Sequence, residues 1–484
     1  MNIAMILEMA ASAGDRQAVT ADGRSLTAAE LLRLAGIAAD RFRAYPAVLY
    51  LGANHLAYPI ALFGAALAGV PFVPLNYRLG EQQLAALEAR HPGALVLRPA
   101  DLASLTDPAD GAAGAEPVPS DRDGVAVLLY TSGTTAEPKA AILRHRHLLA
   151  YVLNTLEFAS AGEDDAALVA VPPYHIAGLA NLLTNLYTGR RVVYQERFEP
   201  KEWLDAVRRE RISHALVVPT MLARIVASVS GDDAQAPSLR SLAYGGARTP
   251  RPVLERALQV FPETGFVNAY GLTETASSIA VLGPGDHRKA LAATDPAERA
   301  RLGSVGRALP GVEFQIRAED GRVLGADETG LVFARGEQIS GEYGTRSVLD
   351  EGGWFATRDL GRLDAGGYLF IDGRADDTII RGGENIAPAE IEDVLLGHPD
   401  VTEAVVLGLP DPEWGQRLVA VVVGGGEPEE LRTWVRDRLR SSKTPDVIVF
   451  RDELPRTDTG KLLRRNLVAE LSAAEPSDQE SSRA

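Results

Sequence analysis

The 484-residue sequence contains no cysteine, which excludes disulfides, thiolate metal sites and a cysteine nucleophile. Basic residues are in the minority, with 49 Lys and Arg against 65 Asp and Glu, a formal net charge of −16. This balance disfavours general binding to nucleic acid or to an anionic membrane. A locally basic pocket could still hold an anionic substrate. Aromatic residues make up only 6% of the chain and do not indicate which substrate a pocket takes.

Long apolar runs are also missing. The N-terminus lacks the basic start and the apolar core of a secretion signal. The most apolar charge-free stretch, residues 58–75, is interrupted by Pro59, Gly64, Gly69, Pro71 and Pro74. These residues favour a buried helix, a turn and a short strand over a membrane span. We therefore expect a soluble, cytoplasmic protein without a membrane partner.

The length and the pattern of apolar segments predict two or more domains. Up to about residue 121, apolar segments of helix and strand length alternate, which is typical of βα units and a largely parallel sheet. Residues 303–370 carry short strand patterns between glycine and aspartate turns, as in a small β-rich subdomain. Beyond residue 373, strand patterns at 401–407 and 418–423 precede a helical pattern at 427–439. We expect an α+β domain there and a disordered tail at 472–484.

A polar loop after residues 125–130 is the first segment whose residues suit ligand binding. These six apolar residues predict a buried strand, and ligands of open α/β sheets sit at the carboxyl ends of such strands. Gly133 lets the backbone approach a ligand, and Lys139 supplies a cation, so the loop suits a polyphosphate. The spacing is not that of a Walker loop, and a polar turn with a surface lysine is the alternative. The hydroxyl donors are Thr131, Ser132, Thr134 and Thr135.

This loop resembles the phosphate-binding motif of the adenylate-forming superfamily, which includes acyl- and aryl-CoA ligases, stand-alone adenylation enzymes and luciferases. Further along, residues 268–275 (Asn-Ala-Tyr-Gly-Leu-Thr-Glu-Thr) resemble a second motif of that family. The resemblance implies Tyr270 at adenine, Thr273 at the α-phosphate and Glu274 at Mg²⁺, roles that suit a flat ring, a hydroxyl and a carboxylate. It also places these residues at the nucleotide: Gly245, Gly246, Ala247, Asn268, Ala269 and Gly271.

Two later motifs of the family are also present. Asp359 corresponds to the family's ribose-binding aspartate, with Arg374 assisting, and a hairpin with a surface salt bridge is the alternative. Asp376 corresponds to the hinge on which the family's C-terminal domain rotates between two catalytic poses. The resemblance then places a pantetheine tunnel for coenzyme A at Gly382, Gly383 and Glu384, where the absence of side chains on the glycines leaves a channel open.

The last motif, Leu454-Pro-Arg-Thr-Asp-Thr-Gly-Lys461, ends on a lysine beside a glycine. A mobile lysine can stabilise negative charge at the carboxylate–phosphate centre. The resemblance makes Lys461 the adenylation lysine, whereas the motif by itself would indicate a solvated surface residue.

The acyl pocket is the least specific part of the sequence. Tyr174, His175 and Gly178 resemble a motif of the acyl-CoA ligases, and we expect Gly246 and Gly271 to line the same pocket. Family members that activate α-amino acids usually carry an aspartate near the position of His175. We therefore expect another class of small carboxylic acid, with His175 lining or gating the pocket, or packing as a structural residue.

Two residues depart from the family pattern. Ala136 and Arg358 stand where the family usually has glycine, in the phosphate loop and directly before the ribose aspartate. Neither change removes a charged catalytic group, but both put a fast first step in doubt.

The resemblance covers nearly the whole chain. It implies an α/β N-terminal domain at 1–373, made of two α/β subdomains and a small β-barrel, and a mobile α+β C-terminal domain at 374–471. The implied reaction joins a carboxylate to AMP with Mg·ATP and then to coenzyme A. The alternatives are transfer to a carrier protein, an enzyme that uses a preformed acyl-adenylate, and a non-catalytic nucleotide-binding protein. The oligomeric state is not indicated.

Overall fold

The computed structural model describes residues 1–107, 121–131, 139–231, 233–344, 346–382, 384–457, 460 and 462–473. The chain divides into two compact units. The larger unit comprises Met1–Gly246, Leu258–Gln315 and Phe333–Ala356, and the smaller one comprises Ala247–Ala257, Ile316–Val332 and the chain from Thr357 onward. Both units mix helices and strands, which confirms the predicted α/β class with a larger and a smaller part.

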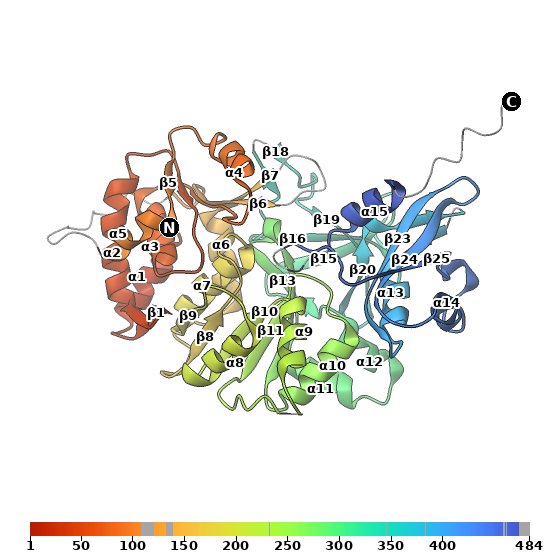
Figure 1. Cartoon of the computed structure of the whole chain (residues 1–484). Helices are drawn as coiled ribbons and strands as arrows, with labels where there is room; N and C mark the ends of the chain where they lie inside the picture. Colours follow the sequence, from red (N-terminus) through yellow and green to blue (C-terminus); the bar gives the residue numbers. More distant parts are fainter. Residues whose placement is uncertain are drawn as a thin grey trace. The chain divides into compact units, whose positions relative to one another are not determined.

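A nine-stranded sheet in the order β14–β13–β12–β11–β10–β8–β9–β1–β2 organises the larger unit (Figure 1). The neighbours from β12 to β1 pair in parallel, so the carboxyl ends of β11 and β12 lie at the same edge. β13 pairs antiparallel with β12. The strands are β1 (Gln17–Ala21), β2 (Arg24–Thr27), β8 (Ala166–Val169), β9 (Arg191–Tyr194), β10 (His214–Val217), β11 (Ser241–Gly245), β12 (Gly265–Leu272), β13 (Ser277–Leu282) and β14 (Arg307–Ala308).

A seven-stranded sheet in the order β18–β17–β7–β6–β4–β3–β5 carries the polar loop. β6 pairs in parallel with β4 and antiparallel with β7. β17 then pairs antiparallel with both β7 and β18. The strands are β3 (Val48–Tyr50), β4 (Phe72–Pro74), β5 (Leu95–Leu97), β6 (Val125–Thr131), β7 (Lys139–Arg144), β17 (Glu342–Tyr343) and β18 (Arg346–Ser347).

Helix α3 (Ala57–Ala68) is buried at every position, and its end is set by Gly69 at φ 73°. β4 follows, so the predicted buried helix, turn and short strand are confirmed. α3 packs against α2 (Ala28–Phe42), which begins with a capping box between Thr27 and Glu30. Among the described residues, no helix is long and apolar enough to cross a membrane.

Further helices of the larger unit pack on its sheets. α7 packs on β8 and β9, and α9 packs on β11 and on α8 (Figure 1). The helices are α1 (Ala4–Ser12), α4 (Glu81–Glu88), α5 (Leu102–Thr106), α6 (His145–Thr155), α7 (Ile176–Thr188), α8 (Pro200–Arg209), α9 (Pro219–Ser228), α11 (Pro284–Ala292) and α12 (Pro296–Ala300). α10 (Arg251–Val260) begins in the smaller unit and ends in the larger one.

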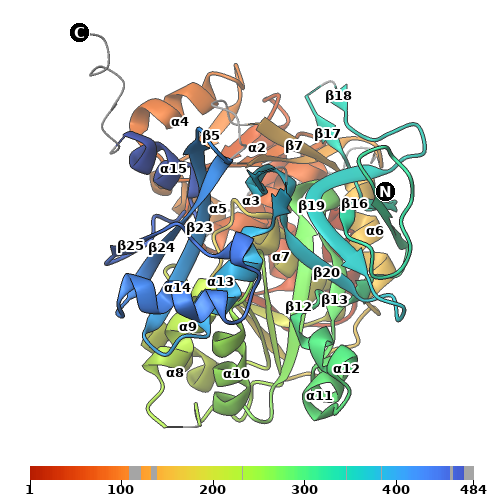
Figure 2. The same ribbon diagram turned by 90° about the vertical axis from the view of Figure 1, so that its right-hand side faces the viewer.

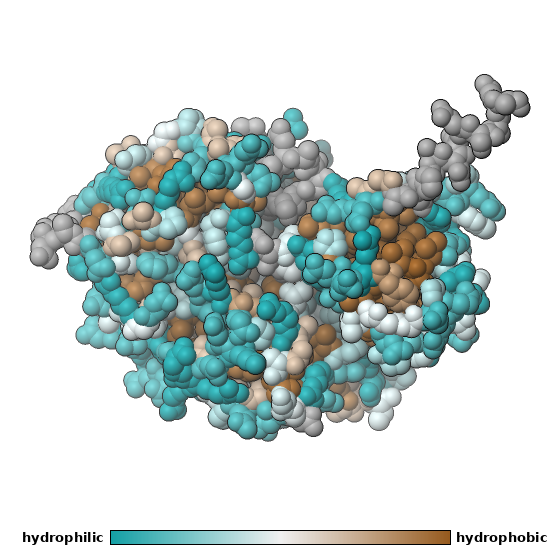
Figure 3. Space-filling model, viewed as in Figure 1, coloured by the Kyte–Doolittle hydropathy of each residue, from teal (hydrophilic) through white to brown (hydrophobic). Residues whose placement is uncertain are grey.

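The smaller unit is built on the three-stranded sheet β23 (Val401–Asp411), β24 (Gly415–Gly424) and β25 (Val447–Arg451). Its core packs α13 (Pro388–Leu396) and α14 (Pro428–Arg436) beside this sheet (Figure 2). α15 (Arg464–Ala473) packs on β23. β23 and β24 form a longer hairpin than the predicted strands at 401–407 and 418–423. Hydrophobic side chains gather at the surface over β24 and β25 (Figure 3).

Short strands occupy the region for which a small β-rich subdomain is expected. A four-stranded sheet has the order β15–β16–β19–β20, and β21 and β22 form a separate hairpin. The strands are β15 (Val312–Arg317), β16 (Gly330–Gly336), β19 (Phe355–Leu363), β20 (Leu369–Arg374), β21 (Ile379–Arg381) and β22 (Glu384–Ile386).

Candidate active site

The polar loop begins and ends at paired positions of one hairpin. Thr131, the last residue of β6, lies opposite Lys139, the first residue of β7, and Lys139 is exposed. The structure therefore presents Lys139 where the loop returns to the sheet. The remaining predicted loop residues lie outside the described residues: Ser132, Gly133, Thr134, Thr135 and Ala136.

The two glycine-containing segments come together at the ends of β11 and β12. Gly245 lies opposite Ala269 in the parallel pair, and a Cβ added to Gly245 would stand 2.1 Å from the Ala269 carbonyl oxygen. The sequence needs glycine at this position because the two backbones approach so closely. Gly246 follows at φ 84°, and Asn268 donates from its side-chain amide to the Ser304 carbonyl at 3.1 Å. Ala247 begins the first segment of the smaller unit.

A bulge turns the chain between Tyr270 and Gly271, where the β12–β13 register shifts. A Cβ on Gly271 would stand 2.0 Å from the Ser277 carbonyl oxygen, so this glycine is also required by backbone packing. Tyr270 remains half-buried. Immediately after β12, a single 3₁₀ turn at Thr273–Thr275 presents Thr273 and Glu274.

Glu274 is a buried carboxylate, with 8% of the residue exposed. The Tyr343 hydroxyl donates a hydrogen bond to its Oε1, and the Ser340 backbone N–H donates to its carbonyl oxygen at 2.8 Å. Within the described part of the chain, no lysine, arginine or histidine forms a salt bridge with Glu274. A buried carboxylate without a cationic partner suits a cation that arrives with a ligand.

The described residues contain no group of three or more acidic or histidine side chains that could hold a metal ion by themselves. A single carboxylate fits Mg²⁺, which keeps several waters and shares its coordination with substrate phosphates. The donor set is therefore compatible with the Mg²⁺ role expected for Glu274.

Three of the predicted acyl-pocket residues, Tyr174, His175 and Gly178, lie around the start of α7, whereas Gly246 follows β11 and Gly271 lies in β12. His175 is the residue before the helix, and the Tyr174 ring stacks at a tilt on its imidazole, with 4.5 Å between ring centroids. Tyr77 meets Tyr174 edge to face at 5.7 Å. A Cβ on Gly178 would stand 2.9 Å from the Pro172 carbonyl oxygen. The structure thus brings Tyr174, His175 and Gly178 together, and the half-buried imidazole remains accessible.

In the smaller unit, Asp359 and Arg374 lie opposite each other on β19 and β20. Arg374 Nε stands 2.9 Å from Asp359 Oδ1, and the Asp359 side chain is only 5% exposed. Arg374 also donates to the Thr357 carbonyl at 3.1 Å, while the Thr357 hydroxyl accepts from the Asp359 backbone N–H at 3.1 Å. The two residues therefore form an ion pair in which Arg374 holds the carboxylate of Asp359, while Thr357 holds the Asp359 backbone.

Arg358, the departure next to this pair, has φ 64°. This is the left-handed region that favours glycine. Its guanidinium lies 3.9 Å from Oδ2 of Asp376, the predicted hinge residue, and both side chains are well exposed. The left-handed backbone conformation at position 358 thus explains why the family pattern has glycine there.

Gly382, from the predicted tunnel, packs against Trp414. Its backbone N–H donates to the Trp414 carbonyl at 2.8 Å, and a Cβ at its φ of 55° would stand 3.0 Å from the indole ring. Arg381 lies 5.5 Å from the centre of this ring, and Glu384 is 3.7 Å from Arg440. Gly383 and Lys461 lie outside the described residues.

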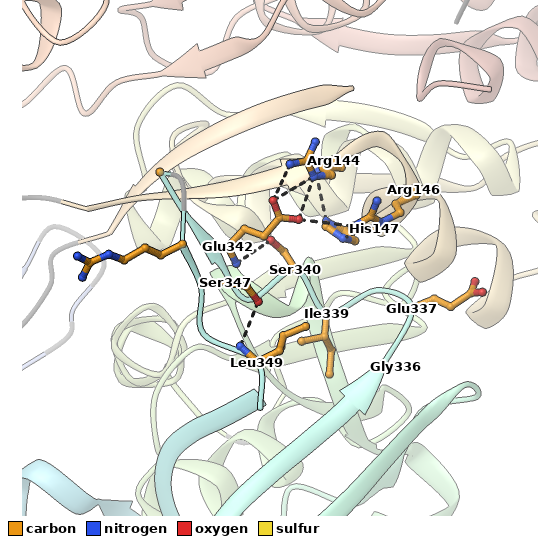
Figure 4. Close-up of a pocket in the computed structure, with 12 residues that line it drawn as sticks. Arg144, Arg146, His147, Gly336, Glu337, Ile339, Ser340, Glu342, Ser347 and Leu349 are labelled. Carbon is orange, nitrogen blue, oxygen red and sulfur yellow. Dashed lines mark hydrogen bonds and ion pairs between the residues drawn. The ribbon is translucent and has the colours of Figure 1, made fainter. Parts of the chain in front are cut away.

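A cavity of about 450 Å³ in the larger unit was not predicted from the sequence. It lies between the end of β7 and residues 336–349, and Arg144, Arg146, His147 and Glu342 converge along one side of it (Figure 4). Arg144 and Glu342 are 198 residues apart, so no local pattern reveals their contact.

Comparisons with known proteins identify the family. A family model described as "AMP-binding enzyme" matches residues 7–343, and one described as "AMP-binding enzyme C-terminal domain" matches residues 390–461. The chain belongs to the AMP-binding enzyme family. It is 36% identical to a feruloyl-CoA synthase from an Amycolatopsis species, over 92% of this chain and 94% of that protein. An indoleacetate–CoA ligase from Aromatoleum aromaticum is 34% identical, with 87% and 88% covered.

A solved structure is similar along almost the whole chain of this AMP-binding enzyme. The o-succinylbenzoate CoA synthetase from Bacillus subtilis, in complex with its acyl-adenylate intermediate, has a TM-score of 0.82 and 30% identity, with 96% of this chain and 97% of that one covered. The same synthetase with ATP and magnesium ion has a TM-score of 0.80. The expected family and its acid–CoA ligase branch are confirmed.

Proposed function

We propose that this AMP-binding enzyme joins an aryl-bearing carboxylic acid to coenzyme A in two steps. In the first, a carboxylate oxygen attacks the α-phosphorus of ATP, which gives an acyl-adenylate and releases pyrophosphate. In the second, the thiol of coenzyme A attacks the acyl carbon, a proton leaves the sulfur, and AMP departs. The observation that carries the proposal is Glu274, a buried carboxylate without a cationic partner among the described residues, directly after the two glycine-lined strands.

Each of the expected site residues has its own role in this reaction scheme. Tyr270 and the Gly245–Gly246 backbone would bind adenine, and Thr273 would bind the α-phosphate. Asp359 would accept hydrogen bonds from the ribose hydroxyls. Arg374, whose Nε lies 2.9 Å from Oδ1, would hold the carboxylate in place for this role. Lys139 and Lys461 would stabilise negative charge on the phosphates. Catalysis on this scheme is mainly positioning and charge stabilisation.

Glu274 would hold Mg²⁺, which when bound neutralises charge on the phosphates. For the protein's own part, burial keeps bulk water from the carboxylate, and the Tyr343 hydroxyl fixes one of its oxygens.

The relatives and the residues expected at the acyl pocket support the proposed substrate class. Relatives of similar length are named for ferulate and indoleacetate, and another for 2-succinylbenzoate, all of them aromatic acids. The rings of Tyr77, Tyr174 and His175 contact one another, which would place aromatic side chains beside the acyl group at the proposed site. His175 stands where an aspartate would pair with an ammonium, so we propose that α-amino acids are poor substrates.

Two further elements belong to the proposal. Residues 1–373 would form the N-terminal domain and 374–471 a C-terminal domain that turns about Asp376, with the pantetheine arm passing Gly382. The use of ATP and coenzyme A favours a cytoplasmic location.

A carrier protein is the second candidate acceptor. One relative, 32% identical over 93% of this chain, is named as a fatty acid–[acyl-carrier-protein] ligase. Coenzyme A is favoured because the relatives named for aromatic acids are CoA ligases.

The test is pyrophosphate release with ATP and a panel of aromatic, aliphatic and α-amino acids, with and without coenzyme A. We expect release with aromatic acids, and a thioester only when coenzyme A is present. Thioester formation from a synthetic acyl-adenylate, without release from any acid, would mean that the first step has been lost. Transfer to a carrier protein but not to coenzyme A would overturn the proposed acceptor.

A further inference from the structure

The segment from Gln338 to Tyr343 holds the turn that carries Glu274. Besides its contacts from Tyr343 and Ser340, this turn is held by the Gln338 side-chain amide, which donates to the carbonyls of Thr275 at 2.9 Å and Ser278 at 2.8 Å. Gln338 and Ser340 are each only 2% exposed. A buried segment more than 60 residues away in sequence therefore fixes both the backbone and the carboxylate of this residue.

The same segment is attached to β7, the strand that follows the polar loop. Tyr343 pairs with Ala141 in the antiparallel register of β17 and β7. Beside it, the Arg144 guanidinium donates to both carboxylate oxygens of Glu342 at 2.7–3.1 Å (Figure 4). The Ser340 hydroxyl adds a hydrogen bond to the Ile142 carbonyl. Tyr343 thus reaches Glu274 from a strand that is fixed to the one beginning at Lys139.

A glutamate carboxylate rotates about a terminal torsion with a broad energy minimum, so burial alone does not fix its orientation. A hydroxyl that donates to Oε1 fixes this rotation and leaves Oε2 for another ligand. Groups that orient a metal ligand in this way contribute to metal affinity without touching the metal.

We propose that Tyr343 is a positioning residue for Glu274, and that the Arg144–Glu342 ion pair positions Tyr343. The inference rests on the proposed function only in taking Glu274 as the residue that meets the divalent cation. It gives the segment from Gln338 to Tyr343, part of which lines the cavity, a role in orienting Glu274 that the reaction scheme does not otherwise include.

The test measures binding of Mn²⁺, in place of Mg²⁺, by electron paramagnetic resonance of the free ion, with the full chain and α,β-methylene ATP. This nucleotide cannot be split between its α- and β-phosphorus atoms, so no acid and no turnover are needed. We expect Tyr343→Phe to weaken Mn²⁺ binding about 10- to 100-fold, the effect usual for residues that orient a metal ligand. Glu342→Gln should weaken it a few-fold.

Tyr50→Phe is the matched control, because Tyr50 is fully buried and donates to the Ala53 carbonyl at 2.9 Å, away from Glu274. It should leave Mn²⁺ binding unchanged. Weakening in Glu274→Gln but not in Tyr343→Phe would overturn the inference. Equal weakening in Tyr343→Phe and Tyr50→Phe would also overturn it, since the effect would then be a general loss of packing. Failure of the proposed ligase activity is seen separately, as absent pyrophosphate release by the unchanged enzyme.

Discussion

Replacing Arg358 tests whether the backbone next to the proposed ribose aspartate is strained. Arg358 lies within β19 at φ 64°, a conformation that costs a residue with a Cβ about 1–2 kcal/mol. Glycine avoids this cost. Its greater conformational freedom in the unfolded chain, however, lowers the free energy of unfolding by about 0.5–1 kcal/mol. We therefore expect Arg358→Gly to unfold with a free energy about 0.5–1 kcal/mol above that of Arg358→Ala.

Comparing glycine with alanine removes the contribution of the arginine side chain. Both variants lose the 3.9 Å contact with Asp376, whose exposed groups contribute at most about 0.5 kcal/mol. Arg362 provides the control, because it lies in the same strand but is not among the residues with positive φ. Both of its variants lose the same cation–π contact with Phe370 at 4.1 Å. At this position glycine should be the less stable of the two by about 0.5–1 kcal/mol.

The assay is urea unfolding of the full chain, with hydrogen exchange of the β19–β20 peptides as a local measure. Opposite signs at the two positions would establish the strain. If Arg358→Gly is no more stable than Arg358→Ala, Arg358 does not occupy the left-handed region, and the explanation of this departure is wrong.

Two further predictions concern pH and the first catalytic step. Burial lowers the pKa of His145 and of His147 from 6.5 to about 4. The unfolded chain therefore takes up these protons first, and the free energy of unfolding should fall by about 1.4 kcal/mol per pH unit for each histidine as pH drops from 6.5 towards 4. A slope in acid urea titrations that His147→Gln leaves unchanged would contradict this. Lys461→Ala should abolish acid-dependent pyrophosphate release and spare thioester formation from supplied acyl-adenylate, whereas equal loss of both would refute its role.

The sequence predicted most of what is local. The strand before the polar loop and the buried helix α3 with its turn at Gly69 were expected and are present. The Asp359–Arg374 ion pair on a hairpin is also present, whereas the ribose-binding role expected for Asp359 stays a prediction. These features depend on short patterns, or on motifs whose order along the chain resembles that of a family.

Contacts between distant segments could not be predicted in the same way. Tyr343 bonds to a carboxylate 69 residues away, and Arg144 meets a glutamate 198 residues away. A tyrosine or an ion pair has no period or spacing that marks its partner. The pairing of β17 with β7 brings Glu342 to Arg144, and Glu274 meets Tyr343 from the turn after β12. The strain at Arg358 could not be predicted either. The sequence shows that arginine replaces the glycine of the family pattern, but it does not show that the backbone there has a positive φ.

The buried carboxylates of Asp359 and Glu274 should respond to neutralisation in opposite ways. Asp359 has a guanidinium at 2.9 Å, so Asp359→Asn leaves Arg374 without its charge partner and should lower the free energy of unfolding. The loss should be about 1–2 kcal/mol, less than for a fully buried pair because Arg374 is 39% exposed.

Glu274 has a hydroxyl as its partner and no cation among the described residues. In Glu274→Gln the amide oxygen can still accept from Tyr343, while the uncompensated charge is gone. This variant should therefore be about 0.5–2 kcal/mol more stable than the unchanged protein in EDTA, and should lose that advantage when Mg²⁺ and ATP are added. A Glu274→Gln protein that is less stable in EDTA would mean that its charge already has a partner within the chain, and Glu274 would then not be a site that depends on a cation from the ligand.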